Sequence, residues 1–220
     1  MRRTSCPARS LSAVDLTEPE IRVLGCLIEK QRTTPDAYPL TLNSLRLACN
    51  QSTNRDPVTD YDEATVRTAA QRLGSARLSR FASGAGSRTA KYRHMADEAL
   101  GLDRAELAVL CILMLRGEQT PGELRSRTER LHQFESAEDL MATLDGLVER
   151  EFAVCIRRRP GQKEDRFSHL LGRDDDGAGA PRVPDVAVAS QPKVEEDSRI
   201  DRLERELSSL RARVEALEQG

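Results

Sequence analysis

The stretch Thr17-Glu-Pro-Glu-Ile-Arg-Val-Leu-Gly-Cys-Leu-Ile-Glu-Lys30 returns 86 residues later as Asp103-Arg-Ala-Glu-Leu-Ala-Val-Leu-Cys-Ile-Leu-Met-Leu-Arg116. Four residues of the first copy are identical in the second at this offset: Glu20, Val23, Leu24 and Leu27. Both copies open with a residue that can cap a helix, Thr17 or Asp103, followed three residues later by an acid. Each copy therefore predicts a helix that ends before a Thr-Pro pair, Thr34-Pro35 or Thr120-Pro121, and together they predict an internal repeat.

A second match lies further along the chain. The stretch Glu63-Ala-Thr-Val-Arg-Thr-Ala-Ala-Gln-Arg-Leu73 resembles Glu138-Asp-Leu-Met-Ala-Thr-Leu-Asp-Gly-Leu-Val148 at an offset of 75. Because this offset is 11 residues shorter than the first, we expect extra length in the first copy, around Asn50-Gln-Ser-Thr-Asn-Arg-Asp-Pro57.

Each copy ends in a predicted hairpin. Residues 78–82 and 152–157 predict strands, and each is followed by a turn, Ser83-Gly-Ala-Gly-Ser87 or Pro160-Gly-Gln-Lys163. The returning strands end at Tyr92-Arg-His94 and Phe167-Ser-His169. Three helices and a hairpin are the order of a winged helix. We therefore predict a mostly helical α+β fold of two tandem winged-helix domains, residues 15–95 and 96–171, after a disordered N-terminus of residues 1–14.

The end of the chain changes in composition. Residues 172–198 contain Asp174-Asp-Asp-Gly-Ala-Gly-Ala-Pro181 and too few apolar side chains to offset the entropy of ordering, which predicts a disordered linker. Residues 199–219 then predict a coiled-coil helix. Its a and d positions are Ile200, Leu203, Leu207, Leu210, Val214 and Leu217. β-branched residues at a with Leu at d favour a parallel homodimer, and the alternative is a helix that docks on its own domains.

Composition limits the class of protein. Of the 220 residues 38% are hydrophobic but only 3% are aromatic, and Trp is absent, so the core must be mainly Leu, Val, Ile and Ala. No apolar run reaches a membrane span, and no apolar segment follows Arg2-Arg3 as in a signal peptide. The odd number of cysteines, without a C-x-x-C pair, fits a reducing cytoplasm. Two of them, Cys26 and Cys111, lie in apolar helical stretches and are predicted to be buried.

Charge is distributed unevenly along the chain. The formal net charge is +6 for residues 1–95, −4 for residues 96–171 and −4 for residues 172–220. Only the first segment is therefore a candidate for binding a polyanion.

Several motifs in order resemble the YceH-like family of bacterial proteins over residues 16–171. They are the stretch Leu16 to Lys30, Tyr38-Pro-Leu-Thr-Leu-Asn43, Ala48-Cys-Asn-Gln51, Asn54-Arg-Asp-Pro57 and Arg159-Pro-Gly-Gln-Lys163. The resemblance implies two winged-helix domains in tandem and says little about activity. Ser52-Thr53 departs from the Lys-Ser pair of the family pattern, which puts a role for a basic residue at position 52 in doubt.

The third helix and hairpin of the first copy predict a surface that binds double-stranded DNA. Val66, Ala69, Ala70 and Leu73 recur at helical spacing and should face the core, which turns Arg67, Thr68, Gln71 and Arg72 outward. Arg and Gln can read guanine and adenine edges. The hairpin adds five cations with no acid between the first and the last: Arg77, Arg80, Arg88, Lys91 and Arg93. The alternative is a scaffold whose winged helices bind proteins and whose coil assembles the complex.

The second copy has a different predicted role. Its third helix region is acidic, with Glu135, Glu138, Asp139, Asp145 and Glu149, and would repel phosphates. Arg157-Arg-Arg159 on its hairpin is diluted by Glu164 and Asp165. We therefore expect it to pack or to bind a protein partner. For Asn54-Arg-Asp-Pro57 of the first copy, a capped turn and a partner-binding loop both remain open.

No catalytic constellation emerges from the residue pattern. His94 and His169 occupy equivalent places and should serve their hairpins, while His132 stands alone. The chain lacks the clustered Cys and His of a zinc site, and its Gly-rich turn lies between strands rather than before a helix. We expect no enzyme activity, metal or cofactor.

Overall fold

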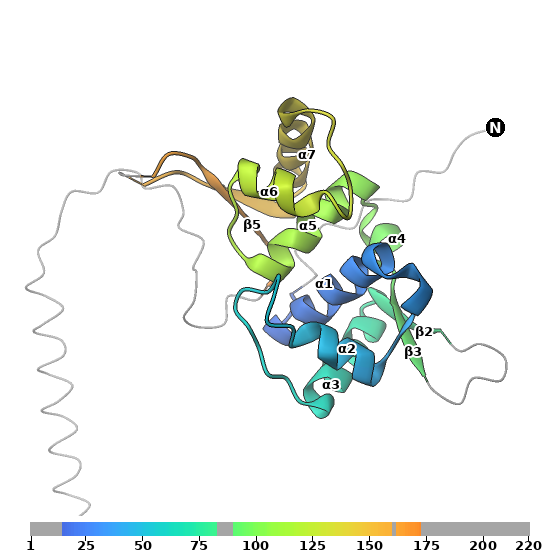
Figure 1. Cartoon of the computed structure of the whole chain (residues 1–220). Coiled ribbons are helices and arrows are strands. Elements are labelled where there is room, and N and C mark those ends of the chain that lie inside the picture. The colour runs from blue at the N-terminus through green and yellow to red at the C-terminus, as the bar shows by residue number, and fades with distance from the viewer. Residues whose placement is uncertain (1–14, 83–89, 160–161, 173–220) are drawn as a thin grey trace, which may run out of the picture. The chain divides into compact units, whose positions relative to one another are not determined.

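The computed structural model describes residues 15–82, 90–159 and 162–172, which combine helices with short antiparallel strands, so the predicted α+β class is confirmed (Figure 1). All of these residues lie in one compact unit. Several predictions concern residues outside the described ranges: the disordered N-terminus 1–14, Arg88, the linker beyond Gly172 and the coiled coil 199–219 with its six seam residues.

The first copy of the repeat contains three main helices and a small sheet. Its elements are α1 (Glu18–Thr33), the 3-10 turn η1 (Pro35–Ala37), β1 (Leu40–Thr41), α2 (Leu42–Cys49), α3 (Glu63–Ser75), β2 (Ser79–Ala82) and β3 (Lys91–His94). The strands pair antiparallel in the order β1-β3-β2, so β2 is an edge strand.

The second copy follows the same order. Its elements are α4 (Ala96–Leu100), α5 (Arg104–Arg116), α6 (Pro121–Thr128), α7 (Ala137–Glu149), β4 (Ala153–Ile156) and β5 (Arg166–His169). β4 pairs with β5, and Gln119 bridges Phe167 in the place that β1 takes in the first copy. No described helix has the length and apolar character needed to cross a membrane.

The two repeated stretches form the central helices. Asp103 and Glu106 cap α5 reciprocally at 2.9 Å, and Glu20 accepts from the backbone of Thr17 at 2.7 Å at the start of α1. Residues 20–28 of α1 and 107–115 of α5 are all buried, because each helix packs on its own repeat and on the other central helix. The predicted burial of Cys26 and Cys111 is confirmed.

α1 and α5 contact each other at equivalent positions. The Cys111 thiol donates to the Gly25 carbonyl oxygen at 3.3 Å, and these residues correspond at the repeat offset of 86. A Cβ on Gly25 would lie 2.9 Å from Cδ2 of Leu115, so the two helices approach closely at this point. Because Gly25 and Cys111 are equivalent positions of the repeat, their contact is the one expected of two helices packed with pseudo-two-fold symmetry.

The structure corrects the alignment of the two copies. Pro35 begins the η1 turn, whereas Thr120 caps α6, and the true counterpart of Thr120 is Thr41, which caps α2. Both central helices end before their Thr-Pro pair, as predicted, but the two pairs are not structural counterparts, and the second helices correspond at an offset of 79. The third helices correspond at 74 rather than 75, because the buried residues of α3 recur in α7 at this spacing. The first copy is thus longer than the second by seven residues between its first and second helices and by five residues between its second and third helices, in residues 50–62.

The Asn54-Arg55-Asp56-Pro57 segment is held by a buried guanidinium. Arg55, whose side chain is fully buried, binds both carboxylate oxygens of Glu29 on α1, at 3.1 and 2.7 Å. It also donates to the carbonyl oxygen of Ala48 at 3.1 Å and to Oε1 of Gln51 at 3.0 Å. Burial alone would raise the pKa of Glu29, but the hydrogen bonds and charge of Arg55 lower it. Glu29 is therefore ionised at neutral pH.

The same segment joins the two copies of the repeat. The backbone nitrogen of Asp56 donates to the carbonyl oxygen of Leu115 at 2.9 Å, and Arg116 hydrogen-bonds the side chain of Asn54. At the opposite end of α1, the backbone nitrogen of Leu16 donates to the carbonyl oxygen of Leu171 at 2.9 Å. These contacts give the segment a structural role.

Candidate nucleic-acid interface

The third helix of the first copy presents the predicted residues to solvent. Asp62 caps α3 by accepting from the backbone nitrogen of Thr65 at 2.7 Å. The inward side of α3 is buried as predicted and consists of Val66, Ala69, Ala70 and Leu73. The four outward residues, which we call the α3 face, are all exposed: Arg67, Thr68, Gln71 and Arg72.

Both arginines of the α3 face have carboxylate neighbours. Arg67 pairs with Glu63 one turn earlier, and both side chains are about half exposed. Nη1 of Arg72 lies 3.8 Å from Oε1 of the buried Glu20 on α1. Exposed ion pairs stabilise a fold by only about 0–1 kcal/mol, so a phosphate can compete for Arg67. The α3 face nevertheless has little unbalanced charge.

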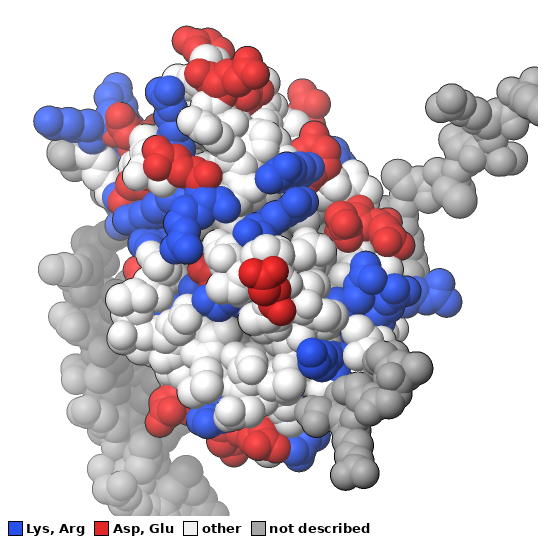
Figure 2. All heavy atoms as spheres, turned by 45° about the vertical axis from the view of Figure 1, so that its right-hand side comes forward, with Lys and Arg blue, Asp and Glu red and all other residues white. Residues whose placement is uncertain are grey.

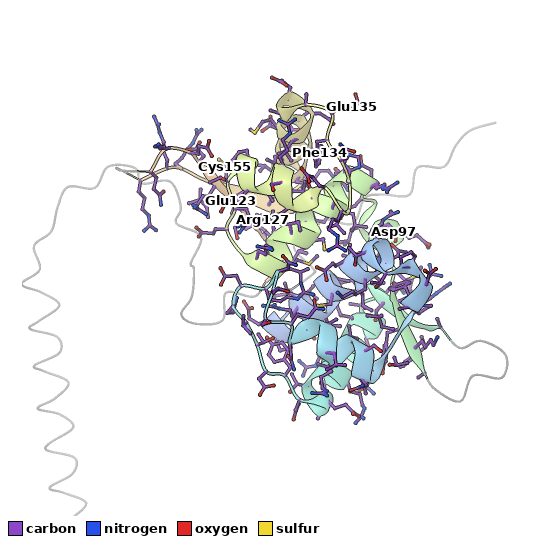
Figure 3. All side chains as sticks on the ribbon, viewed as in Figure 1. Asp97, Glu123, Arg127, Phe134, Glu135 and Cys155 are labelled. Atoms are coloured by element: carbon purple, nitrogen blue, oxygen red, sulfur yellow. The ribbon has the colours of Figure 1, made fainter. Side chains whose placement is uncertain are left out.

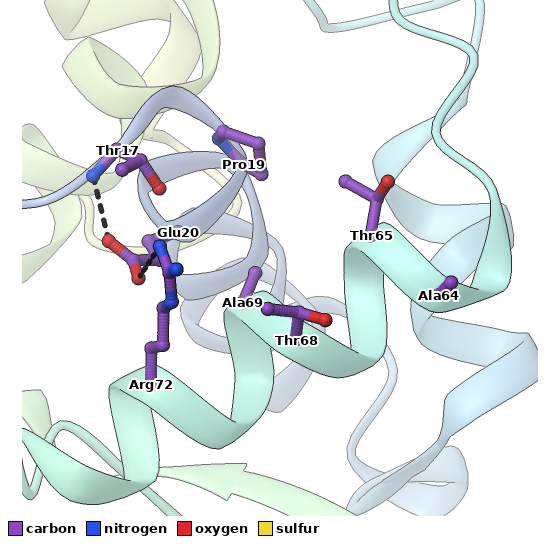
Figure 4. Close-up of a pocket in the computed structure, with 8 residues that line it drawn as sticks. All are labelled: Thr17, Pro19, Glu20, Ala64, Thr65, Thr68, Ala69 and Arg72. Atoms are coloured by element: carbon purple, nitrogen blue, oxygen red, sulfur yellow. Dashed lines mark hydrogen bonds and ion pairs between the residues drawn. The ribbon is translucent and has the colours of Figure 1, made fainter.

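A shallow groove of about 320 Å³ lies where α3 meets the start of α1 (Figure 4). Its lining consists of Thr17, Pro19, Glu20, Ala64, Thr65, Thr68, Ala69 and Arg72. The two charged residues of the lining, Glu20 and Arg72, are the ion pair itself. The groove therefore offers hydroxyl groups to a ligand but no unpaired cation.

Strand alternation places the other cations on a different surface. Ser79 pairs with His94 and Phe81 with Tyr92, and all of these except Phe81 are buried, so they define the core side of the sheet. The intervening residues lie on the opposite side, which we call the outer sheet face. Its cations are Arg80, Lys91 and Arg93.

The outer sheet face carries positive charge that no described acid balances. Arg80 and Arg93 are direct cross-strand partners, and like charges in this arrangement repel. None of its three cations forms an ion pair with another described residue, and Nε of Arg93 is buried without a hydrogen-bond partner among them. Figure 2 turns this side of the molecule forward and shows blue side chains on the sheet side of the first copy. Bound phosphates would relieve the repulsion.

The nine predicted residues thus divide between surfaces. Four form the α3 face and three belong to the outer sheet face, while Arg77 is exposed with a positive φ of 62° just before β2. Arg88 lies outside the described residues.

Phe81 is a surface residue that the sequence analysis missed. Its side chain is 54% exposed, although it is on the core side of the sheet, and its ring centroid lies 4.9 Å from that of Tyr92. The alternation of β2 alone suggests a buried residue at this position. Its exposure follows from the tertiary packing, which leaves the ring uncovered although Tyr92 opposite it is buried.

The two hairpin histidines serve equivalent structural roles, as predicted. Nδ1 of His94 accepts from the backbone of Ala96 at 3.3 Å, and Nδ1 of His169 accepts from Leu171 at 3.4 Å. Nε2 of His94 lies 2.7 Å from Oε1 of Gln31. Burial lowers the pKa of each imidazole to about 4, so both are neutral at pH 7.

The second copy presents acids where the first presents cations. All five predicted acids are exposed, and Figure 2 shows red side chains at the top of the molecule, over α7. On α6, Glu123 forms an ion pair at 3.3 Å with Arg127, one turn later (Figure 3). Figure 3 also labels Glu135, which precedes α7, and Cys155, which lies on β4. Arg157 is paired with Asp165 at 3.1 Å. The basic run of this hairpin is therefore partly neutralised.

The described residues were also compared with the requirements of a metal site. In residues 15–82, 90–159 and 162–172, no three His, Cys, Asp or Glu side chains are grouped so as to hold a metal ion. The cysteines of these ranges, Cys26, Cys49, Cys111 and Cys155, are free thiols.

Comparison with known proteins identifies relatives without an assigned activity. The family model described as "Protein of unknown function, DUF480" matches residues 16–162. The chain is 47% identical over 204 residues to a "UPF0502 protein" of Pelobacter propionicus, covering 92% of this chain and 93% of the relative. It is 50% identical over 173 residues to one of Opitutus terrae, covering 77% and 75%, and 48% identical over 191 residues to one of Koribacter versatilis, covering 86% and 87%.

Proposed function

The chain belongs to the DUF480 family, whose description names no function, and we propose that its first copy is a winged helix that binds double-stranded DNA. The order of three helices and a hairpin, present twice, supports tandem winged-helix domains at residues 15–95 and 96–171. DNA as a partner agrees with the cytoplasmic location and the regulatory role expected from the sequence, and the proposal assigns no catalysis.

The observation that carries the proposal is the outer sheet face. Arg80, Lys91 and Arg93 lie on one side of a short sheet, and no described carboxylate forms an ion pair with them. Cations that repel one another in the free protein gain most from a polyanion, because phosphates supply the missing charge and the released counterions add entropy. In a winged helix the hairpin contacts the DNA backbone, which is the role that this face suits.

The α3 face contributes less to affinity in this proposal. Thr68 and Gln71 are exposed and can reach base edges, but Asp62 and Glu63 bring negative charge to the start of α3. Sequence readout normally uses the first turns of the recognition helix. We therefore expect binding dominated by phosphate contacts, with modest sequence preference.

The test is the salt dependence of duplex binding, measured by fluorescence anisotropy between 50 and 200 mM salt, a range of about four-fold. The triple variant Arg80→Gln, Lys91→Gln, Arg93→Gln should bind more weakly, and the slope of log K against log salt should fall by about 0.9 for each phosphate that is no longer neutralised. The matched control is Arg125→Gln, Arg130→Gln, Arg158→Gln, which removes three exposed cations of the second copy. An equal loss of affinity in the control, or no duplex affinity at low salt, contradicts the proposal.

A protein-interaction scaffold is the second candidate function. It is favoured by the carboxylate neighbours of Arg67 and Arg72 and by the exposed acids of α7, which suit a basic protein surface. Affinity recovery of the full chain from native cells, with and without nuclease, separates the two. Recovered DNA supports the first candidate. The second candidate is supported by a protein partner that is still recovered after nuclease treatment and is lost when the α7 acids are replaced.

A further inference from the structure

The geometry of the first hairpin points to Phe81 as a stacking platform, and we propose that the first copy binds DNA with an unstacked base more tightly than fully paired DNA. The inference rests on the proposed DNA binding and names the form of DNA preferred. Phe81 has no role in the phosphate contacts proposed above.

The exposure of Phe81 sets it apart among the aromatic residues. All seven Phe and Tyr side chains lie in the described ranges, and the other six are buried or partly covered, while Phe81 is 54% exposed. Exposing an aromatic ring to water forgoes the free energy of burial, so this position adds little to stability. An exposed aromatic ring on a cationic hairpin has the character of a contact residue.

The ring of Phe81 is already oriented by its neighbours. It packs on Tyr92 with the ring planes at 45°, and Tyr92 is 5% exposed and held in the core. Burial raises the pKa of the Tyr92 hydroxyl, while the charge of Arg67 on α3 acts against this rise. Arg67 of α3 is therefore close enough to Tyr92, the residue on which Phe81 packs, for its charge to act there. A ring fixed in this way loses little conformational entropy when a flat partner stacks on it.

Charges for the backbone of such a partner lie on both sides of the ring. β2 is an edge strand, so a nucleic-acid strand along this edge meets Arg80 on the outer sheet face. On the other side, Arg67 of α3 acts on Tyr92 beneath the ring, and a phosphate can compete with Glu63 for it. A cationic track combined with an aromatic ring is the combination by which proteins bind unpaired bases. In a paired duplex both faces of each base are covered by stacking, so only an unstacked base can use Phe81.

The experiment compares a paired duplex with the same duplex interrupted by a short single-stranded gap. The wild-type chain should bind the gapped DNA about ten-fold more tightly, within the range that base stacking on an aromatic side chain provides. Phe81→Ala should lose this preference and keep the salt slope, because a neutral side chain releases no counterions. Phe81→Trp should retain the preference.

A control variant tests whether the loss of any exposed apolar side chain would have the same effect. Leu47 on α2 is 56% exposed, so Leu47→Ala removes a comparable apolar side chain and should leave the preference unchanged. Equal binding of both DNAs by the wild type, a preserved preference in Phe81→Ala, or an equal loss of preference in Leu47→Ala overturns the stacking role while DNA binding stands. Absence of salt-dependent binding to either DNA overturns the proposed function as well.

Discussion

The thiol of Cys111 donates a hydrogen bond to the carbonyl oxygen of Gly25 at 3.3 Å, and the two residues hold the same position in the two copies of the repeat. α1 and α5 thus meet back to back, as the first helices of a two-fold dimer would. The two copies of the repeat therefore pack on each other within one chain. They differ in charge, because the first copy carries a basic hairpin and the second an acidic third helix.

The helix packing at Gly25 predicts an effect on stability. A Cβ there would lie 2.9 Å from Cδ2 and 3.0 Å from Cγ of Leu115, a buried side chain. We expect Gly25→Ala to lower the free energy of unfolding by about 1–3 kcal/mol, since overpacking outweighs the better helix propensity of alanine. In α7, Gly146 has only an atom at 4.0 Å from such a Cβ, so Gly146→Ala should gain up to about 1 kcal/mol. Urea unfolding that shows Gly25→Ala to be as stable as wild type contradicts the packing.

Arg55 and Glu29 predict a strongly coupled pair. Arg55→Met leaves the Glu29 carboxylate without its bidentate partner and should cost about 3–5 kcal/mol in urea unfolding. Adding Glu29→Gln should restore part of the loss, so that the double variant is less damaged than the sum of the single variants. The exposed pair of Arg67 with Glu63 is the control, because Arg67→Met should lower the free energy of unfolding by no more than about 1 kcal/mol. Strict additivity of Arg55→Met and Glu29→Gln argues against the pair.

The buried imidazole of His94 predicts a pH dependence of stability. The pKa of His94 is about 4 in the folded chain, below the unfolded value of about 6.5, so the unfolded state binds the extra proton between these values. Its contribution is therefore complete above about pH 6.5 and is lost as the pH falls toward 4, by up to about 3 kcal/mol. His94→Gln should be less stable at pH 7 and should lose less stability between pH 7 and pH 5. An unchanged slope in urea unfolding at these two pH values contradicts this account.

The heptad pattern at the end of the chain predicts a homodimer. In a parallel coiled coil, Arg199 faces Glu204 and Glu206 faces Arg211 of the other chain, and both pairs attract. We expect the full chain to sediment as a dimer at roughly tens of micromolar, because the coil of about three heptads is short and its helices are only marginally stable as separate chains. A chain ending at Gly172, which keeps the pairing of Leu16 with Gly172, should sediment as a monomer. A full chain that sediments as a monomer rules out the coil as the dimer interface.

The sequence alone determined the features that arise from short-range chemistry. The capping residues Thr17 and Asp103, the buried side of α3 and the equivalent hairpin histidines all depend on neighbours within about one or two helical turns, so their patterns could be interpreted directly. The repeat also gave the order of the elements. The two Thr-Pro pairs marked the ends of the central helices correctly, but they are not structural counterparts, because Pro35 begins a separate turn and Pro121 begins α6.

Only the tertiary structure decided which residues meet across the chain. The contact of Gly25 with Cys111 and the bond of Arg55 to Glu29 join residues 86 and 26 positions apart, and packing rather than local preference brings them together. The register of β2 with β3 likewise separates Arg80 and Arg93 from the α3 face and leaves Phe81 uncovered. A shift of one residue would exchange the two sides of the strand, and that choice is made by the core beneath the sheet.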